Sequence, residues 1–225
     1  SFIRRSRGYT PEPYTINYDV SDAKVLALGP DLDVTFSIAR GDKVYPSQHI
    51  GNTNKPKTLT FLKQALENMQ RITKINEFDV IACDMHPHFF TTRMAHELAE
   101  KYDAKVLPVQ HHHAHSVALA NDHGLEEMIV IAADGVGYGS DGTSWGGEIL
   151  YTNINSFDRL AHLQSQLMPG GDMATKYPAR MLASILNDEN LIRKYSKYFK
   201  YGETEIKNIF KQLASGINVG KTTST

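Results

Sequence analysis

The sequence predicts an α/β fold made of two similar lobes with mixed sheets. Short apolar runs that alternate like strands are separated by longer segments whose apolar residues recur at helical spacing. Three strands followed by a helix occur twice, about a hundred residues apart, which indicates a duplication. We expect residues 1–20 to be a linker from an absent upstream domain, residues 21–124 to form the first lobe, and residues 125–225 to form a second, partial lobe.

Composition narrows the class of protein. A formal net charge of −1 gives no electrostatic footprint for nucleic acid or for an anionic membrane. No apolar run approaches the roughly 18 residues of a transmembrane helix, and residues 1–7 lack the apolar core of a signal peptide. The single cysteine, Cys83, excludes an internal disulfide and a cysteine-based zinc cage, and its apolar surroundings predict a packed thiol. We therefore expect a cytoplasmic protein with neither a membrane nor a nucleic acid as partner.

The first lobe follows from the order of its apolar patterns. Residues 1–20 carry Arg4, Arg5 and Arg7 without periodicity, so we interpret them as a solvated linker, although the arginines could grip a phosphate. Three antiparallel strands and a helix come next, followed by alternating strands and helices that predict crossovers onto a mixed sheet. The expected strands are 24–29, 33–40, 43–49, 79–83 and a buried 104–109; the expected helices are 56–74 and 91–102.

The second lobe begins with the same succession. Strands are expected at 128–133, 146–152 and 158–164. A loop at 169–172 leads to a helix around residues 179–185, and residues 191–201 predict a basic helix that carries tyrosines.

Four of the ten histidines lie within residues 111–115. The segment after them predicts a helix that stops at Gly124, so His111 and His115 stand at i and i+4 on one face. This spacing lets one helix offer two nitrogens to one metal ion. Asp134, where an apolar run meets a glycine loop, could add a carboxylate. The alternative is a helix start with surface histidines. His112 and His113 point about 100° and 200° away and cannot share the ligand face.

Residues 134–148 form a glycine-rich loop. Glycine lets backbone N–H groups approach a phosphate closely, but a hairpin merely rich in turn residues is the alternative. Gly137, Gly139 and Gly142 formally match a dinucleotide-binding pattern, yet the segment after them predicts a strand instead of a helix, which argues against a Rossmann fold. Trp145, the only tryptophan, is unusual in such a loop without a packing partner or a ligand.

Several blocks of the sequence resemble the HypF family, the carbamoyltransferases of NiFe-hydrogenase maturation. The resemblance runs in order along nearly the whole chain, and its QHHHAH and WGGE blocks are specific. The matching blocks are 4–9, 47–51, 84–87 with Thr92-Arg93, 109–115, 134–148 and 168–172.

The resemblance implies a fold and two sites. The matching portion is similar to the threonylcarbamoyl-transferase (Kae1-like) fold, with the duplicated lobes of the actin/sugar-kinase-like, ribonuclease H-like superfamily. His111, His115 and Asp134 match the ligands of a divalent metal (iron, zinc or magnesium). No catalytic residue is identified. ATP or carbamoyl-adenylate would lie against the glycine loops, namely at Gly135, Gly137, Tyr138, Gly139, Asp141, Gly142, Thr143, Gly146, Gly147, Glu148, Gly170, Gly171 and Asp172.

The implied activity is carbamoyl transfer from carbamoyl-adenylate to the C-terminal cysteine of HypE, a step in the synthesis of the hydrogenase cyanide ligands. The implied partners are a HypE-like acceptor protein and the upstream domains of HypF, including a YrdC-like domain. Since the second lobe is expected to be incomplete, we expect this chain alone to lack activity. The alternatives are a non-catalytic HypF-related protein that binds a nucleotide or a metal and, with less support because no basic surface is predicted, a tRNA threonylcarbamoyl-transferase relative.

Overall fold

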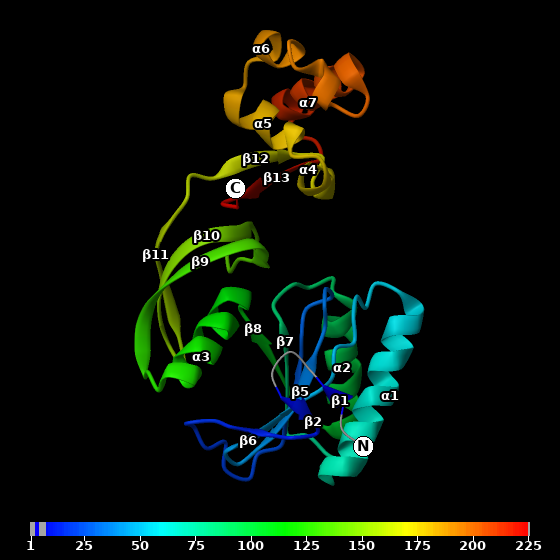
Figure 1. Cartoon of the computed structure of the whole chain (residues 1–225), viewed down its shortest axis with the longest axis vertical. Coiled ribbons are helices and arrows are strands. Elements are labelled where there is room, and N and C mark those ends of the chain that lie inside the picture. Colours follow the sequence, from blue (N-terminus) through cyan, green and yellow to red (C-terminus); the bar gives the residue numbers. More distant parts are fainter. Residues whose placement is uncertain (1–2, 5–7, 225) are drawn as a thin grey trace. The chain divides into compact units, whose positions relative to one another are not determined.

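The computed structural model describes residues 3–4 and 8–224 of the chain (Figure 1). The chain divides into two compact units, Ser1–Glu126 and Glu127–Thr225, so the division falls two residues after the expected one. The expectation for Arg5 and Arg7 lies outside the described residues.

Unit 1 is built on a six-stranded mixed sheet with the order β3-β6-β5-β4-β7-β8. The strands β4, β5 and β6 form an antiparallel meander, and β7 and β8 add to β4 in parallel, as the sequence predicts. These strands are β3 (Tyr14–Thr15), β4 (Val25–Leu28), β5 (Phe36–Arg40), β6 (Lys43–Pro46), β7 (Val80–Asp84) and β8 (Lys105–Val109).

Helices α1 (Pro56–Thr73) and α2 (Phe90–Tyr102) pack against this sheet (Figure 1). Three of the apolar positions that predict α1 are buried, namely Leu62 at 0%, Met69 at 1% and Leu66 at 3% exposure, whereas Ile72 is 54% exposed. Cys83 lies in the same core at 3% exposure, which confirms the packed thiol. Burial and the neighbouring Asp84 carboxylate raise the pKa of Cys83, so this thiol is a poor nucleophile.

Two expectations for unit 1 were wrong. The stretch expected to be a linker contains strands β1 (Ile3–Arg4), β2 (Tyr9–Thr10) and β3, and β3 pairs with β6 as the edge of the main sheet. Strand β8 was expected to be buried, but it lies at the opposite edge of the sheet and leaves Leu107 45% exposed. An apolar run of this length fits an edge strand as well as a central one.

Unit 2 contains a second sheet with the order β11-β10-β13-β12, and β9 pairs with β10. Strands β9 (Glu127–Tyr138), β10 (Ser144–Asn153) and β11 (Phe157–His162) form the expected antiparallel meander. Strand β9 continues past Asp134, because Gly137 pairs with Trp145 of β10. Asp134 therefore lies within a strand, and the loop between the strands shrinks to 139–143. The sequence did not predict β12 (Gln166–Pro169) and β13 (Val219–Thr222), which pair antiparallel.

Helices α4 (Asp172–Lys176), α5 (Ala179–Leu186), α6 (Glu189–Arg193) and α7 (Gly202–Ser215) form the rest of unit 2. Helix α5 confirms the expected helix, whereas a single helix over residues 191–201 was wrong. That stretch is a short α6, a 3-10 turn (Ser196–Tyr198) and a bend that buries Phe199. The unpredicted α7 supplies the core residues Ile206 and Ile209, both at 0% exposure. None of the helices in the described part of the chain has the length and hydropathy of a membrane-spanning segment.

Candidate metal and nucleotide sites

The histidine helix α3 (His111–His123) begins where β8 ends. Gln110 caps it, because its side-chain oxygen accepts the His113 backbone N–H at 2.9 Å, and Gly124 ends it in the left-handed conformation with φ 65°. The predicted i,i+4 pair lies at its first turn, with the Nε2 atoms of His111 and His115 3.2 Å apart. Two nitrogens bound tetrahedrally at 2.0–2.1 Å from zinc are about 3.3 Å apart, so this pair fits a shared metal ion.

Of the two intervening histidines, His112 faces the interior. His112 is buried at 1% exposure, and its Nδ1 lies 3.3 Å from the Gln110 side-chain nitrogen. His113 contributes its backbone N–H to the cap. His112 is thus a core residue of unit 1 and not a member of the ligand pair.

A carboxylate that sequence reasoning did not include adjoins the histidine pair. Asp84, at the carboxyl end of β7, is 7% exposed, and its Oδ2 lies 3.3 Å from Nδ1 of His111. Because β7 and β8 are parallel with Asp84 opposite Val109, their carboxyl ends meet at one edge of the sheet. In the sequence, an acidic residue ends one predicted strand, and the histidine helix follows the next. If the two strands are parallel neighbours, this pattern predicts that Asp84 lies beside the histidines.

Asp134, the third predicted metal ligand, belongs to β9 of unit 2. Its Oδ1 accepts the Gly135 N–H at 2.6 Å, and its carbonyl oxygen accepts the Ser224 hydroxyl at 3.3 Å. These two hydrogen bonds hold the backbone around Asp134 in place.

Three of the predicted nucleotide-binding glycines are required by packing. A Cβ on Gly139 would overlap the indole of Trp145. A Cβ on Gly146 would lie 2.5 Å from the Asp134 carbonyl oxygen, and one on Gly147 would lie 2.5 Å from Leu163. These glycines let strands and an aromatic ring approach closely, a role that is independent of any ligand.

Other glycines leave space beside them. A Cβ on Gly135 or Gly171 would meet no described heavy atom within 4 Å, and Gly171 has φ +53°. Gly142 has φ +76° at the turn of the β9–β10 hairpin. Gly135, within β9, and Gly171 are thus two of the predicted glycines beside which there is room for a ligand to approach the backbone.

Asp141 holds the tip of the β9–β10 hairpin together. Its Oδ1 accepts hydrogen bonds from the Thr143 backbone N–H at 3.0 Å, the Thr143 hydroxyl at 2.7 Å and the Trp145 indole N–H at 2.9 Å. Burial acts to raise the pKa of Asp141, but these hydrogen bonds and the Arg159 charge outweigh it and lower the pKa below its ordinary value. The side chains of Asp141 and Thr143 are therefore occupied within the hairpin.

Glu148 is buried at 1% exposure and pairs with Arg159, whose Nε lies 2.6 Å from its Oε2. Its other oxygen accepts the Thr223 hydroxyl and the Gly146 N–H. Burial acts to raise the pKa of Glu148, but the hydrogen bonds from Arg159 and Thr223 and the Arg159 charge keep the pKa below its ordinary value. Glu148, predicted to bind nucleotide, has its carboxylate engaged with the protein. Trp145, 2% exposed, has the packing partner that the sequence called for, because Arg159 covers its ring.

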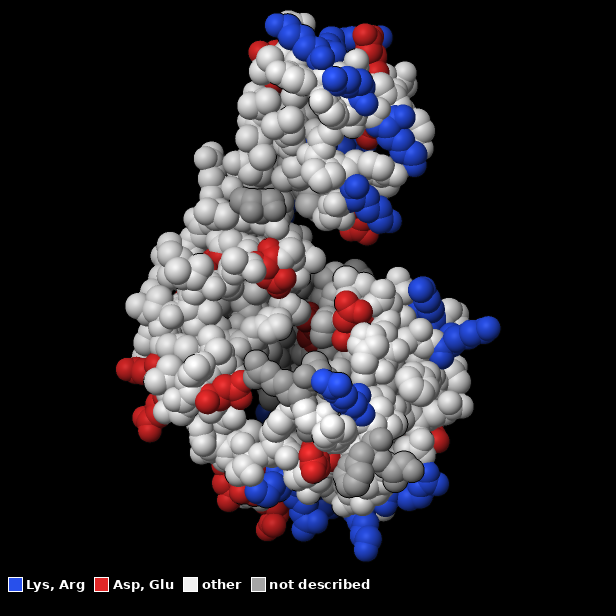
Figure 2. Space-filling model, viewed as in Figure 1, with Lys and Arg blue, Asp and Glu red and all other residues white. Residues whose placement is uncertain are grey.

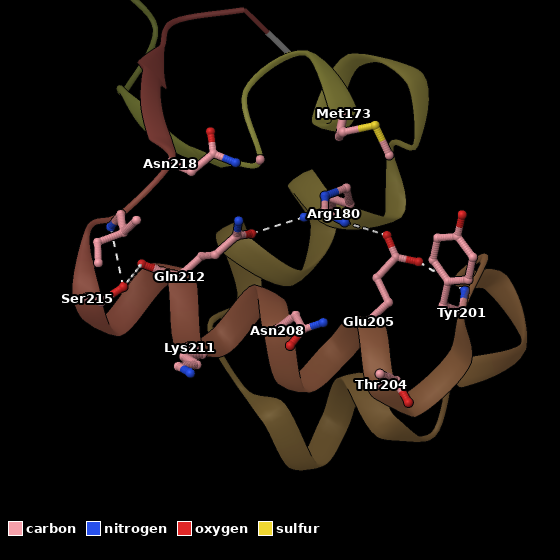
Figure 3. A pocket seen from close by; sticks show the side chains of 12 residues that line it. Met173, Arg180, Tyr201, Thr204, Glu205, Asn208, Lys211, Gln212, Ser215 and Asn218 are labelled. Carbon is pink, nitrogen blue, oxygen red and sulfur yellow. Dashed lines mark hydrogen bonds and ion pairs between the residues drawn. The ribbon is translucent and has the colours of Figure 1, made fainter.

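Unit 2 contains a pocket of about 950 Å³, which Figure 3 shows from close by. This volume suits a ligand the size of a nucleotide. One face of α7 forms a wall, with polar side chains at helical spacing. Gly170 of the second predicted glycine loop lies at the rim, and its N–H donates to the Asn218 carbonyl oxygen at 2.8 Å. The other lining residues are Met173, Arg180, Tyr201, Thr204, Glu205, Asn208, Lys211, Gln212, Ser215, Ile217 and Asn218.

Arg180 ties the glycine loop to α7. Its Nε donates to the Pro169 carbonyl oxygen at 3.0 Å, its Nη1 lies 2.5 Å from Glu205, and its Nη2 donates to Gln212 at 3.0 Å. Figure 3 shows Arg180 between Glu205 and Gln212. Sequence reasoning missed the α7 wall. The pattern that could have predicted this helix is a row of polar residues at i, i+3 and i+4 beside the apolar residues Ile206 and Ile209.

The helical part of unit 2 is rich in positive charge. On the face that Figure 2 shows, Lys and Arg side chains predominate over this part, at the top of the view. Its exposed lysines are Lys176, Lys194, Lys197, Lys200, Lys207 and Lys211, and Lys211 lines the pocket. This charge favours an anionic ligand.

Comparison with known families gives two matches that together cover most of the chain. Residues 20–122 match the family model described as the HypF Kae1-like domain. Residues 130–225 match the model described as the carbamoyltransferase Kae1-like domain, second subdomain.

The chain is similar to longer curated proteins. It is 42% identical over 228 residues to the probable carbamoyltransferase HypF of Methanocaldococcus jannaschii, covering 100% of this chain and 30% of that protein. It is 43% identical over 187 residues to the carbamoyltransferase HypF2 of Cupriavidus necator, covering 83% of this chain and 23% of that protein. The chain thus spans less than a third of these relatives.

Two solved structures share its fold. Full-length HypF in a phosphate- and nucleotide-bound form aligns with a TM-score of 0.87 and 33% identity, over 99% of this chain and 34% of that one. HypF of T. kodakarensis aligns with a TM-score of 0.86 and 39% identity, over 99% of this chain and 31% of that one. The mixed sheets described above therefore have the predicted Kae1-like architecture.

Proposed function

The chain belongs to the HypF family, over the Kae1-like region of that family, and we propose that it carries out the carbamoyl-transfer step of such a protein. The observation that carries this proposal is the i,i+4 histidine pair, whose Nε2 atoms are 3.2 Å apart at the start of α3. The reaction would take place in the cytoplasm, where ATP is available.

The proposed metal ligands are His111, His115 and Asp134. Two imidazoles and a carboxylate are a donor set that suits a divalent transition metal and leaves coordination positions open. Iron and zinc fit these donors better than magnesium, which prefers oxygen ligands throughout. Such a metal supplies a positive charge that polarises a carbonyl and offsets the charge of a phosphate.

The proposed nucleotide site is the pocket of unit 2. Its amide side chains, Asn208, Gln212 and Asn218, can hydrogen-bond a base and a ribose, and Lys211 brings a positive charge. Gly170 also lines the pocket, with its N–H bonded to the Asn218 carbonyl oxygen. One solved relative, full-length HypF, is nucleotide-bound, which supports a nucleotide as a ligand of the family. The ligand would be ATP or a carbamoyl-adenylate.

The proposed acceptor is the C-terminal cysteine thiolate of a HypE-like protein. The thiolate attacks the carbamoyl carbon, a C–S bond forms, and the C–O bond to the adenylate phosphate breaks, so that AMP leaves with the electron pair. The residues of this chain would hold the adenylate in place and keep its carbonyl carbon accessible. The adenylate itself would be made by a YrdC-like domain of a HypF protein.

The test supplies the chain with ATP, carbamoyl phosphate and HypE, with and without the remaining portion of a HypF protein as a separate polypeptide, and measures HypE by mass spectrometry. We expect one added carbamoyl group on the C-terminal cysteine when the remaining portion is present. If both reactions left HypE unmodified while metal and nucleotide still bound, the chain would be a non-catalytic binding protein, and the proposal would fail.

A further inference from the structure

His111 is held from both sides of its ring. Its Nε2 faces Nε2 of His115 at 3.2 Å, and its Nδ1 faces Oδ2 of Asp84 at 3.3 Å. A neutral imidazole carries one proton, which sits on one nitrogen or the other. A ring nitrogen that binds a metal must present its lone pair, so the position of this proton decides whether the pair can share an ion.

The Asp84 carboxylate is itself fixed in place. Its side chain is 5% exposed, and its Oδ1 accepts the backbone N–H of His86 at 2.8 Å. The Thr92 hydroxyl donates to the backbone carbonyl oxygens of His86 at 2.9 Å and Asp84 at 3.3 Å, which ties the end of β7 to α2. An ionised carboxylate can only accept, so Oδ2 favours a proton on Nδ1 of His111.

We propose that Asp84 is a positioning residue that keeps the His111 proton on Nδ1, so that Nε2 presents its lone pair toward a metal. This inference rests on the proposed function, because the position of the His111 proton matters only if the histidine pair binds a metal. Asp84 contacts the His111 ring and the His86 backbone N–H. It acts through His111, in the way that carboxylates orient metal-bound histidines in other proteins.

The substitution Asp84→Asn separates this role from packing, because asparagine keeps the shape and one acceptor oxygen. The retained oxygen can still accept the His86 N–H, which turns the new amide NH₂ toward His111. The amide then donates to Nδ1 and moves the His111 proton to Nε2, the nitrogen that has to bind. We expect Zn²⁺ affinity, measured by calorimetry, to fall by about 10- to 100-fold.

The matched control is Asp31→Asn. Asp31 is a buried carboxylate of the same unit, at 8% exposure, and it accepts hydrogen bonds from Thr53, Phe90 and Thr91. It accepts the first backbone N–H groups of α2, so its loss should lower stability, while Zn²⁺ affinity should change by less than about twofold because its hydrogen bonds do not involve the histidine pair. Equal losses of affinity in the two variants would mean a general loss of folded protein, and the proposal would be wrong.

A second measurement needs no metal. Long-range ¹H–¹⁵N NMR of the metal-free chain at about pH 8, where an ordinary histidine is neutral, reports which ring nitrogen of His111 carries the proton. We expect Nδ1–H in the wild-type chain and Nε2–H in Asp84→Asn. A wild-type His111 protonated on Nε2, or on both nitrogens, would overturn the proposal. A wild-type chain that bound no metal would instead contradict the proposed function, while the NMR result would still decide the role of Asp84.

Discussion

Arg159 lies over the indole ring of Trp145, with its guanidinium carbon 4.1 Å from the ring centroid. The same guanidinium pairs with Glu148 at 2.6 Å and with Asp141 at 3.2 Å. One side chain of β11 thus holds both the tip of the β9–β10 hairpin and the middle of β10. The hairpin carries Asp134 and Gly135. The positions of these two residues therefore depend on the contacts that Arg159 makes.

Replacing Arg159 with alanine should destabilise unit 2 by about 3 kcal/mol, because it leaves the buried Glu148 carboxylate without its ion partner. Trp145 is the only tryptophan, so its fluorescence during urea unfolding reports this unit. Arg193→Ala is the control, since Arg193 pairs with Glu189 in a partly exposed contact worth less than about 1 kcal/mol. Equal destabilisation by both substitutions would contradict the central role of Arg159.

The stability of unit 2 should fall in acid through Glu148 and Asp141. Both pKa values lie below their ordinary values in the folded chain, so these carboxylates stabilise the fold above the unfolded pKa, and this stabilisation is lost as the pH falls through the folded pKa. The free energy of unfolding should therefore decrease as the pH falls below about 4.5. The difference between the wild-type chain and Glu148→Gln should shrink over the same interval. A difference that stayed constant with pH would rule out this assignment.

Gly139→Ala should destabilise the hairpin, because the added methyl group would overlap the Trp145 indole. Overpacking of this kind costs about 1–3 kcal/mol. Gly135→Ala is the matched control, since its Cβ would meet no described heavy atom within 4 Å. Urea unfolding followed by Trp145 fluorescence measures both variants. The assignment of Gly139 to packing fails if the two substitutions have the same effect on stability.

Lys211→Gln should weaken binding of an ATP analogue by about tenfold, equivalent to about 1.4 kcal/mol, because a charged contact to the ligand is lost. Lys207→Gln is the control, because Lys207 is exposed on the same helix but does not line the pocket. Calorimetry with both variants gives the comparison. If Lys207→Gln weakened binding as much as Lys211→Gln, general electrostatic attraction and not the pocket would explain the affinity.

The sequence predicted the elements whose local patterns are unambiguous. The helical spacing in α1, the capped start of α3 with its i,i+4 histidines, and the meander β4–β5–β6 all follow from periodicity and turn residues. These patterns depend on neighbours within one or two turns of the chain, so they can be read without the tertiary structure.

Features that depend on distant partners could not be predicted in this way. Asp84 meets His111 only because β7 and β8 are parallel neighbours, and the loop after β9 is short only because Gly137 pairs with Trp145. The glycines of the hairpin suggested phosphate binding, whereas Gly139, Gly146 and Gly147 are needed for close packing. Composition alone does not distinguish these two uses of glycine.

The proposed metal site is tested most directly by the metal content of the purified chain, measured by elemental analysis after incubation with Zn²⁺ or Fe²⁺ and desalting. We expect one ion per wild-type chain and none in the double variant His111→Ala, His115→Ala, and binding should weaken as the pH falls below about 6.5 because imidazole must be neutral to bind a metal. His113→Ala is the control and should retain the ion, since His113 points away from the pair. Equal metal content in the wild-type chain and the double variant would contradict the account.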